Sequence, residues 1–185
     1  MDIKITDRLL QGDENAFKEL VEEYRQMVFR TCMGVLHDPE DADDVTQEVF
    51  IEVFRSVGKF RADARISTWL YRIALNKSLN FIRDNRKHRA LSLSGAPQSD
   101  ALTGQGTDGP EEILQNKEKK MILERAIDSL PTKQKKAFVL NKYDDLSYKE
   151  ISEVMKLSVS SVESLLFRAK QNLQKKLLDC YQKSC

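Results

Sequence analysis

Apolar residues recur at steps of three and four along the first part of the chain, which is the spacing of one face of an α-helix. Asp38 followed by Pro39 predicts the start of one helix, and Gly58 predicts its end. The pattern therefore predicts a run of amphipathic helices. They are expected at residues 13–36, 39–57 and 67–86.

The second half of the chain keeps the helical period. Capping boxes at Ser147–Glu150 and Ser160–Glu163 each predict a helix start. A short helix ending near Lys156 and a longer one, joined through Leu157 and Ser158, form a candidate helix-turn-helix, with a plain helical hairpin as the alternative. An earlier helix is expected to bury Ile113, Met121, Leu123, Ile127 and Leu130.

A segment of different composition separates the two halves. Residues 92–110 hold four of the seven glycines, two of the four prolines and no Lys or Arg. Such a segment is typical of a flexible linker. The sequence therefore predicts an all-α protein of two small helical domains, residues 1–91 and 111–185, with the helix-turn-helix in the second.

The overall composition is that of a globular protein, with 185 residues of which 41% are apolar and 32% charged. There is no apolar run of the length that spans a membrane, and the N-terminus lacks the features of a signal peptide. We therefore expect a cytoplasmic protein without membrane insertion. The three cysteines have no histidine at metal-ligand spacing, so we expect free thiols and no metal or other cofactor.

Charge is segregated within the first predicted domain, although the whole chain carries only +1. Residues 1–54 contain five Lys and Arg against fourteen Asp and Glu. Residues 55–91 contain ten Lys and Arg against two Asp. This segregation indicates two partners of opposite charge, one of them nucleic acid.

The second predicted helix carries acidic side chains along one stripe. Asp41, Asp44, Glu48 and Glu52 follow one another at helical spacing, and we call them the acidic ridge. From spacing alone, the ridge is either a solvated face or a surface for a partner.

The third predicted helix aligns Arg72, Asn76, Asn80 and Arg83 on one face. Asparagine can pair with a base edge and arginine can neutralise a phosphate, so this face suits DNA. An ordinary polar helix face explains the same spacing equally well.

Taken in order, four segments resemble extracytoplasmic-function sigma factors, the small two-domain class of bacterial sigma factor. The segments are GDENAFKELVEEY at 12–24, DPEDADDVTQEVFIEVF at 38–54, FRADARISTWLYRIALNKSLNFIRDNRK at 60–87, and the stretch from LPTKQKKAFVL to QNLQKKL at 130–177. The resemblance covers nearly the whole chain.

The resemblance implies that the segment at 43–50 docks on the coiled coil of the β′ subunit of core RNA polymerase, with the β subunit as a further partner. On this basis the ridge is an interface. The expected polymerase-binding residues are Asp41, Asp44, Gln47, Glu48, Phe50 and Glu52.

The resemblance also implies that the loop at 59–65 and the helix after it melt and read the −10 promoter element, where a base is flipped into a protein pocket. Aromatic surfaces then replace lost base stacking, and cations follow the strand. Trp69 is expected to be partly structural as well. The expected −10 contacts are Phe60, Arg61, Arg65, Trp69, Arg72, Asn76, Lys77, Asn80 and Arg83.

The helix-turn-helix is expected to place its second helix in the major groove of the −35 element. Glu163 and Leu165 stand where the family commonly has Lys and Arg, which weakens the phosphate contribution, whereas Glu163 can accept from a cytosine amino group. The expected −35 contacts are Ser147, Tyr148, Ser158, Ser160, Ser161, Glu163, Ser164, Arg168 and Lys170.

The sequence therefore favours a sigma factor that binds core RNA polymerase and directs promoter-specific initiation without covalent chemistry of its own. An anti-sigma factor is a further expected partner. The alternative is a helix-turn-helix regulator that acts without polymerase, which leaves the acidic ridge unused. An enzyme has little support, because the chain has no nucleotide-binding loop, metal-ligand cluster or catalytic triad pattern.

Overall fold

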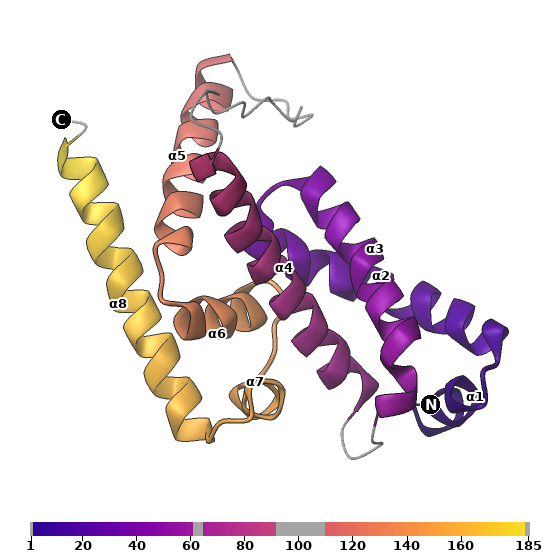
Figure 1. Cartoon of the computed structure of the whole chain (residues 1–185). Helices are drawn as coiled ribbons and strands as arrows, with labels where there is room; N and C mark the ends of the chain where they lie inside the picture. Colours follow the sequence, from indigo (N-terminus) through magenta and orange to yellow (C-terminus); the bar gives the residue numbers. More distant parts are fainter. Residues whose placement is uncertain (1, 61–64, 92–109, 184–185) are drawn as a thin grey trace.

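The computed structural model describes residues 2–60, 65–91 and 110–183, and nearly all of them are helical (Figure 1). No β-strand occurs in these ranges, so the predicted all-α class is confirmed. The elements are α1 (Asp2–Leu10), α2 (Glu14–Leu36), α3 (Pro39–Ser56), the 3-10 turn η1 (Val57–Lys59), α4 (Ile66–Leu91), α5 (Pro110–Asp128), α6 (Thr132–Lys142), α7 (Tyr148–Met155) and α8 (Val159–Lys183).

The three helices predicted in the first half are present as α2, α3 and α4. Asp13 and Asp38 accept hydrogen bonds from amides in the first turns of α2 and α3, and Pro39 opens α3. Helix α4 runs to Leu91, past its predicted end. Helix α1 was not predicted. The predicted linker lies outside the described residues apart from Pro110, where α5 begins.

Helices α1 to α4 pack around one hydrophobic core, and we call them the N-terminal unit. The apolar stripes predicted from the sequence face inward. Each fully buried aliphatic side chain of this kind contributes about 1.5–3 kcal/mol. The largest fully buried side chains of this core are Leu20, Val28, Val45, Val49, Val53, Ile66 and Leu70.

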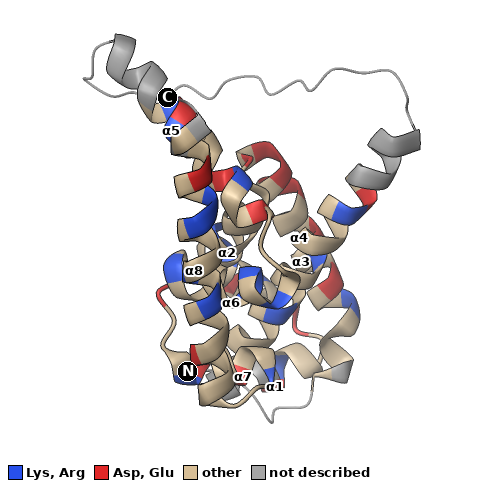
Figure 2. Ribbon diagram, turned by 90° about the vertical axis from the view of Figure 1, so that its left-hand side faces the viewer, with Lys and Arg blue, Asp and Glu red and all other residues tan. Residues whose placement is uncertain are grey.

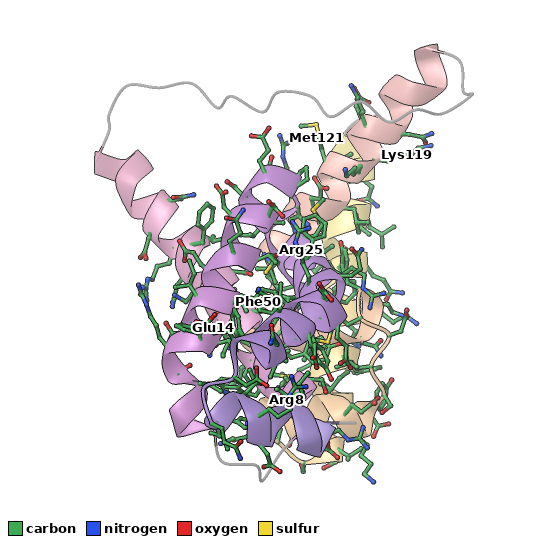
Figure 3. The ribbon with its side chains drawn as sticks, turned by 90° about the vertical axis from the view of Figure 1, so that its right-hand side faces the viewer. Arg8, Glu14, Arg25, Phe50, Lys119 and Met121 are labelled. Carbon is green, nitrogen blue, oxygen red and sulfur yellow. The ribbon has the colours of Figure 1, made fainter. Side chains whose placement is uncertain are left out.

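Helices α5 to α8 form the C-terminal unit, in which α8 lies along α5, α6 and α7 (Figure 1). Ile127 and Leu130 are buried there as predicted. The prediction was wrong for Met121 and Leu123, which are each 42% exposed. The reason is that α5 packs on α8 only near its C-terminal end, and Met121 projects from the outer part of the helix (Figure 3).

The two units pack against each other through a shared apolar cluster. Val35 of α2 and Leu75 of α4 lie in this cluster with residues of α6 and α7. Gly34 permits the close approach, because a Cβ there would lie 2.8 Å from the Tyr143 ring and 2.9 Å from Val139 Cγ1. Any larger residue at this position would push α2 away from α6 unless Tyr143 and Val139 were both replaced by smaller residues.

Buried polar contacts complete this junction. The Lys135 ammonium of α6 donates to the Val35 carbonyl at 2.9 Å and to the Asp128 carboxylate at 2.6 Å. Thr31 Oγ1 of α2 is hydrogen-bonded to Asp144 Oδ2 at 2.9 Å. These bonds satisfy groups that would otherwise be buried without partners, so they fix how the units meet.

Candidate nucleic-acid and protein interfaces

The acidic ridge lies on the outer side of α3, opposite its buried valines. Asp44 and Glu48 are exposed, and Asp41 and Glu52 are partly exposed. The acidic character of this helix can be followed in red in Figure 2. The amphipathic pattern of α3 therefore presents the ridge to solvent, as its spacing predicted.

Neighbouring cations touch only parts of this surface. Arg25, labelled in Figure 3, donates to Asp43 at 2.7 Å. Lys77 of α4 lies 3.9 Å from Glu48 and 3.6 Å from Glu52. Because these pairs are exposed, each contributes about 1 kcal/mol or less to stability. The ridge thus keeps a strong negative field.

Exposed apolar side chains border the ridge. Ile51 is 50% exposed and Phe54 is 60% exposed, and the Phe54 ring meets the edge of Phe17 with centroids 5.2 Å apart. Sequence reasoning missed both, although Ile51 follows Asp44 by seven residues and so shares its face. Phe50, by contrast, is only 7% exposed and belongs to the core.

The aromatic residues expected at the −10 element pack on each other. Phe60 is 9% exposed, and its ring centroid lies 5.0 Å from that of Trp69, which is partly buried. Trp69 thus has the structural role that was expected. Arg65 is exposed beside them, whereas Arg61 lies outside the described residues.

The polar face of α4 is partly covered by the C-terminal unit. Arg72 donates from Nε to the Val154 carbonyl at 2.8 Å and from Nη2 to the Glu153 carbonyl at 2.7 Å. These carbonyls belong to the last turn of α7, where a helix favours cations. Asn76 accepts from the Lys136 ammonium at 2.8 Å. Two residues expected to read DNA are therefore bonded to the C-terminal unit in this arrangement.

The outer end of the same face is open. Asn80 is exposed, and Arg83, also exposed, pairs with its neighbour Asp84 at 3.0 Å. The polar face predicted from the sequence thus has two parts. The C-terminal unit contacts Arg72 and Asn76. Asn80 and Arg83 are open to solvent.

The helix-turn-helix is present in α7 and α8, and its local geometry follows from its serines. Ser147 and Glu150 form the predicted capping box at the start of α7. Lys156 takes the left-handed conformation, with φ of 54°, at the position where glycine is common. The second predicted box is wrong, because α8 starts at Val159, and Ser158, not Ser160, caps it. The Ser158 hydroxyl accepts from the Ser161 amide in the first turn.

The first half of α8 presents a polar surface with large apolar groups. The seven expected −35 residues at Ser158 and beyond are all exposed, as is Tyr148 of α7. Ser158 is hydrogen-bonded to the hydroxyls of Ser160 and Ser161 at 3.2 Å and 2.8 Å. Sequence reasoning missed Val159 and Phe167, which are 45% and 62% exposed. Their exposure could not be read from the sequence, because valine and phenylalanine are residue types that usually lie in a core.

Burial changes the ionisation of two groups at the junction of the units. It raises the pKa of Asp144 to about 6, while the Thr31 hydrogen bond and the charge of Arg30 oppose the shift. Burial also lowers the pKa of Lys136. In the packed arrangement, ionisation of either group therefore costs free energy.

Neither a metal centre nor a membrane segment is found in the described ranges. No three His, Cys, Asp or Glu side chains gather there as metal ligands would. None of the helices there combines the length and the apolar character needed to cross a bilayer.

Comparison with protein families defines the class of this chain. Residues 20–88 match the family model for sigma-70 region 2, and residues 120–173 match the model for sigma-70 region 4. The chain thus contains a sigma-70 region 2 followed by a sigma-70 region 4.

Curated relatives narrow the class. The RNA polymerase sigma-H factor of Pseudomonas aeruginosa is 32% identical over 180 residues, covering 95% of this chain and 93% of the relative. The ECF RNA polymerase sigma-E factor of Escherichia coli is 32% identical over 177 residues, covering 94% and 92%. The chain belongs to the extracytoplasmic-function (ECF) family of RNA polymerase sigma factors. It is a promoter-specific transcription initiation factor, which counts against the polymerase-independent regulator.

Two solved structures have the same fold. The structure of CnrH in complex with the cytosolic domain of CnrY has a TM-score of 0.67 at 24% identity and covers 97% of each chain. The sigma factor RpoE in complex with the anti-sigma factor NepR, from Bartonella quintana, has a TM-score of 0.62 at 16% identity and covers 87% of this chain and 96% of that one. At these identities the likeness establishes the fold alone.

Proposed function

We propose that this sigma factor docks on core RNA polymerase through the acidic ridge of α3 and reads the −10 and −35 elements with α4 and α8. The domains in this proposal are residues 1–91 and 111–185, joined by a linker at 92–110. The observation that carries the proposal is the exposed negative surface of α3 beside the basic helix α4 in one small unit.

The polymerase interface combines charge with apolar contact. The ridge residues, with Gln47, attract a basic surface on polymerase, and Ile51 and Phe54 add apolar area that a protein partner would bury. Phe50 contributes by holding α3 in place, since little of its ring reaches the surface.

The −10 interface uses the basic side of the N-terminal unit. Arg61, Arg65, Arg72 and Arg83 follow the strand, and Lys77 links this side to the ridge. Asn76 and Asn80 read base edges. Phe60 and Trp69 form the wall against which the flipped base is held, with only the outer Trp69 surface in contact.

The −35 interface is the N-terminal half of α8 with the start of α7. Ser160, Ser161, Glu163 and Ser164 face base edges, with Ser158 at the N-terminus of the helix. Arg168 and Lys170 contact the phosphate backbone, as do Ser147 and Tyr148 at the start of α7.

The proposal also covers how this sigma factor acts, where it acts and how it is controlled. The chain performs no covalent chemistry, because its role is binding and strand stabilisation. It acts in the cytoplasm, where polymerase is. It is held inactive by an anti-sigma factor, a partner suggested by the Bartonella quintana complex.

Transcription with purified components tests the proposal directly. The chain added to core RNA polymerase and fragmented genomic DNA should give transcripts that start at shared promoter elements, while core polymerase alone should give none of them. Failure to direct initiation from any fragment would overturn the assignment of these surfaces. Sequencing the transcript starts would also identify both elements.

A further inference from the structure

A cavity of about 310 Å³ lies at the junction of the two units. Its walls come from α4 on one side and from α6 and the end of α7 on the other. The apolar part of the wall includes Leu75, Val154 and Leu157. This volume is at the lower end of the range of small-molecule sites, about 300–1,000 Å³.

Four cations line this cavity, and no Asp or Glu lines it. They are Arg72 from the N-terminal unit and Lys133, Lys136 and Lys156 from the C-terminal unit. Among the described residues, the hydrogen-bond acceptors of Arg72 and Lys136 are neutral oxygens, those of two carbonyls and an amide. Lys133 and Lys156 have no ion pair in the described part of the chain.

Several other cations of the molecule are paired with carboxylates. Lys135, which is 4% exposed, has the Asp128 carboxylate 2.6 Å away. Arg8 pairs with Asp13 and Glu19, and Lys77 with two glutamates. Within the ranges that the structure describes, the four cations of the cavity have no such carboxylate partner. Burial also lowers the pKa of Lys136 and so disfavours its charge. Like charges brought together at partly buried sites repel, unless an anion lies between them.

We propose that this cavity binds a small polyphosphate, with Arg72 on one unit and the three lysines on the other as its ligands. Several phosphate groups match four cations in charge, and the guanidinium fork and ammonium groups are the protein groups that bind phosphate most strongly. A ligand held by both units also stabilises their packed arrangement, because it binds that arrangement and not the separated units. Where the proposed function holds, such a ligand opposes the use of α4 at the −10 element.

Isothermal titration of the full chain with inorganic tripolyphosphate tests the site without any transcription assay. The double variant Lys133→Gln/Lys156→Gln removes two exposed cations of the cavity and should weaken binding by about tenfold or more. Asn76→Asp places a carboxylate in the opposite wall, next to Lys136, and should weaken binding similarly while it keeps the units together. The matched control is Lys119→Gln/Lys142→Gln, which changes the charge equally at exposed lysines outside the cavity.

The control should bind within about twofold of the unaltered chain, because its lysines lie outside the cavity and act on a bound anion only through screened solvent. Equal loss in the control and the cavity variant would reduce the effect to non-specific attraction and overturn the site. Unaltered binding by Asn76→Asp would also overturn it, since the ligand would not touch α4. Absence of binding by the unaltered chain would have the same meaning.

A parallel titration with ATP distinguishes the two sources of a polyphosphate. Tighter binding of ATP than of tripolyphosphate assigns the apolar wall to a nucleoside, and equal or weaker binding assigns the site to the phosphate chain alone. These titrations contain neither polymerase nor promoter DNA, so their outcome does not decide the proposed role in transcription. The transcription experiment tests that role separately.

Discussion

The two charged surfaces of the N-terminal unit are in opposite situations. The acidic ridge on α3 is open to solvent, whereas the polar face of α4 is partly covered by the C-terminal unit. A partner can therefore bind the ridge without any rearrangement of the two units. Arg72 and Asn76 are engaged by the C-terminal unit. If they read the −10 element, as we propose, the units have to separate first, and polymerase binding is an event that can drive this separation.

Locking the units together should have the largest effect on this difference. A Cβ at Gly34 would lie 2.8 Å from Tyr143 Cγ. Since the bond from Cγ to Cβ is about 1.5 Å, cysteines at both positions would have Cβ atoms no more than about 4.3 Å apart, which fits a disulfide. The Gly34→Cys/Tyr143→Cys chain, with Val139→Ala to make room for the new Cβ and with the native cysteines replaced, should lose promoter-directed transcription by about a hundredfold when oxidised.

Reduction of the same protein should restore transcription, and this reversal is the internal control for folding. Each single cysteine variant should be insensitive to oxidant. Full activity of the cross-linked chain, verified by its mobility without reductant, would show that α4 reads DNA without separation of the units.

Reversing the ridge should have the next largest effect. Asp44→Lys with Glu48→Lys replaces two exposed carboxylates without touching the core, so the chain should fold normally and bind core polymerase about tenfold to a hundredfold more weakly. Fluorescence anisotropy of the labelled chain with core polymerase measures the change. Glu22→Lys with Glu23→Lys, on exposed positions of α2, is the matched control. Equal affinity of the two pairs would make the ridge an ordinary solvated face.

Local signals explain why so much of the open surface was predictable from the sequence. The caps at Asp13, Asp38 and Ser147 act within one turn, and the apolar stripe of α3 fixes its outer face by periodicity alone. The start of α8 was harder, because three serines compete for one cap position.

The covered surface was not predictable in this way. Arg72 meets carbonyls that follow it by more than eighty residues, and a carbonyl carries no mark in the sequence. Gly34 likewise has no local role that would reveal its contact with Tyr143. The resemblance to sigma factors assigned roles to α4 and α8 but did not say that the free chain would place one unit over the other.

Asn80 allows the open part of the α4 face to be tested separately from the covered part. It is exposed, so Asn80→Ala should leave the packing of the units unchanged. The loss of one base contact should reduce open-complex formation by about tenfold, within the range of about 1–3 kcal/mol for such contacts. Permanganate reactivity of the −10 region measures strand opening. Normal opening would remove Asn80 from the −10 interface, and Asn85→Ala, exposed on the same helix, serves as the comparison.

The smallest expected effect is on the closure of the units by pH. Burial raises the pKa of Asp144 from its ordinary value of 3.8 to about 6 in the packed arrangement. Thr31, Arg30 and Asp145 act on this carboxyl, and the neutral Tyr71 and Cys32 also interact with its charge. A raised pKa means that the packed arrangement prefers the protonated carboxyl. Closure should therefore strengthen as pH falls through about 6, and this gain should be lost as pH rises through the same range, with little further change above pH 7. Between pH 7 and pH 5 the closing equilibrium should shift by about ninefold, which corresponds to about 1.3 kcal/mol. Energy transfer between dyes on Gln11→Cys and Asn116→Cys, both exposed, reports closure once the native cysteines are replaced. The same shift in an Asp144→Asn background would assign the pH response to another group.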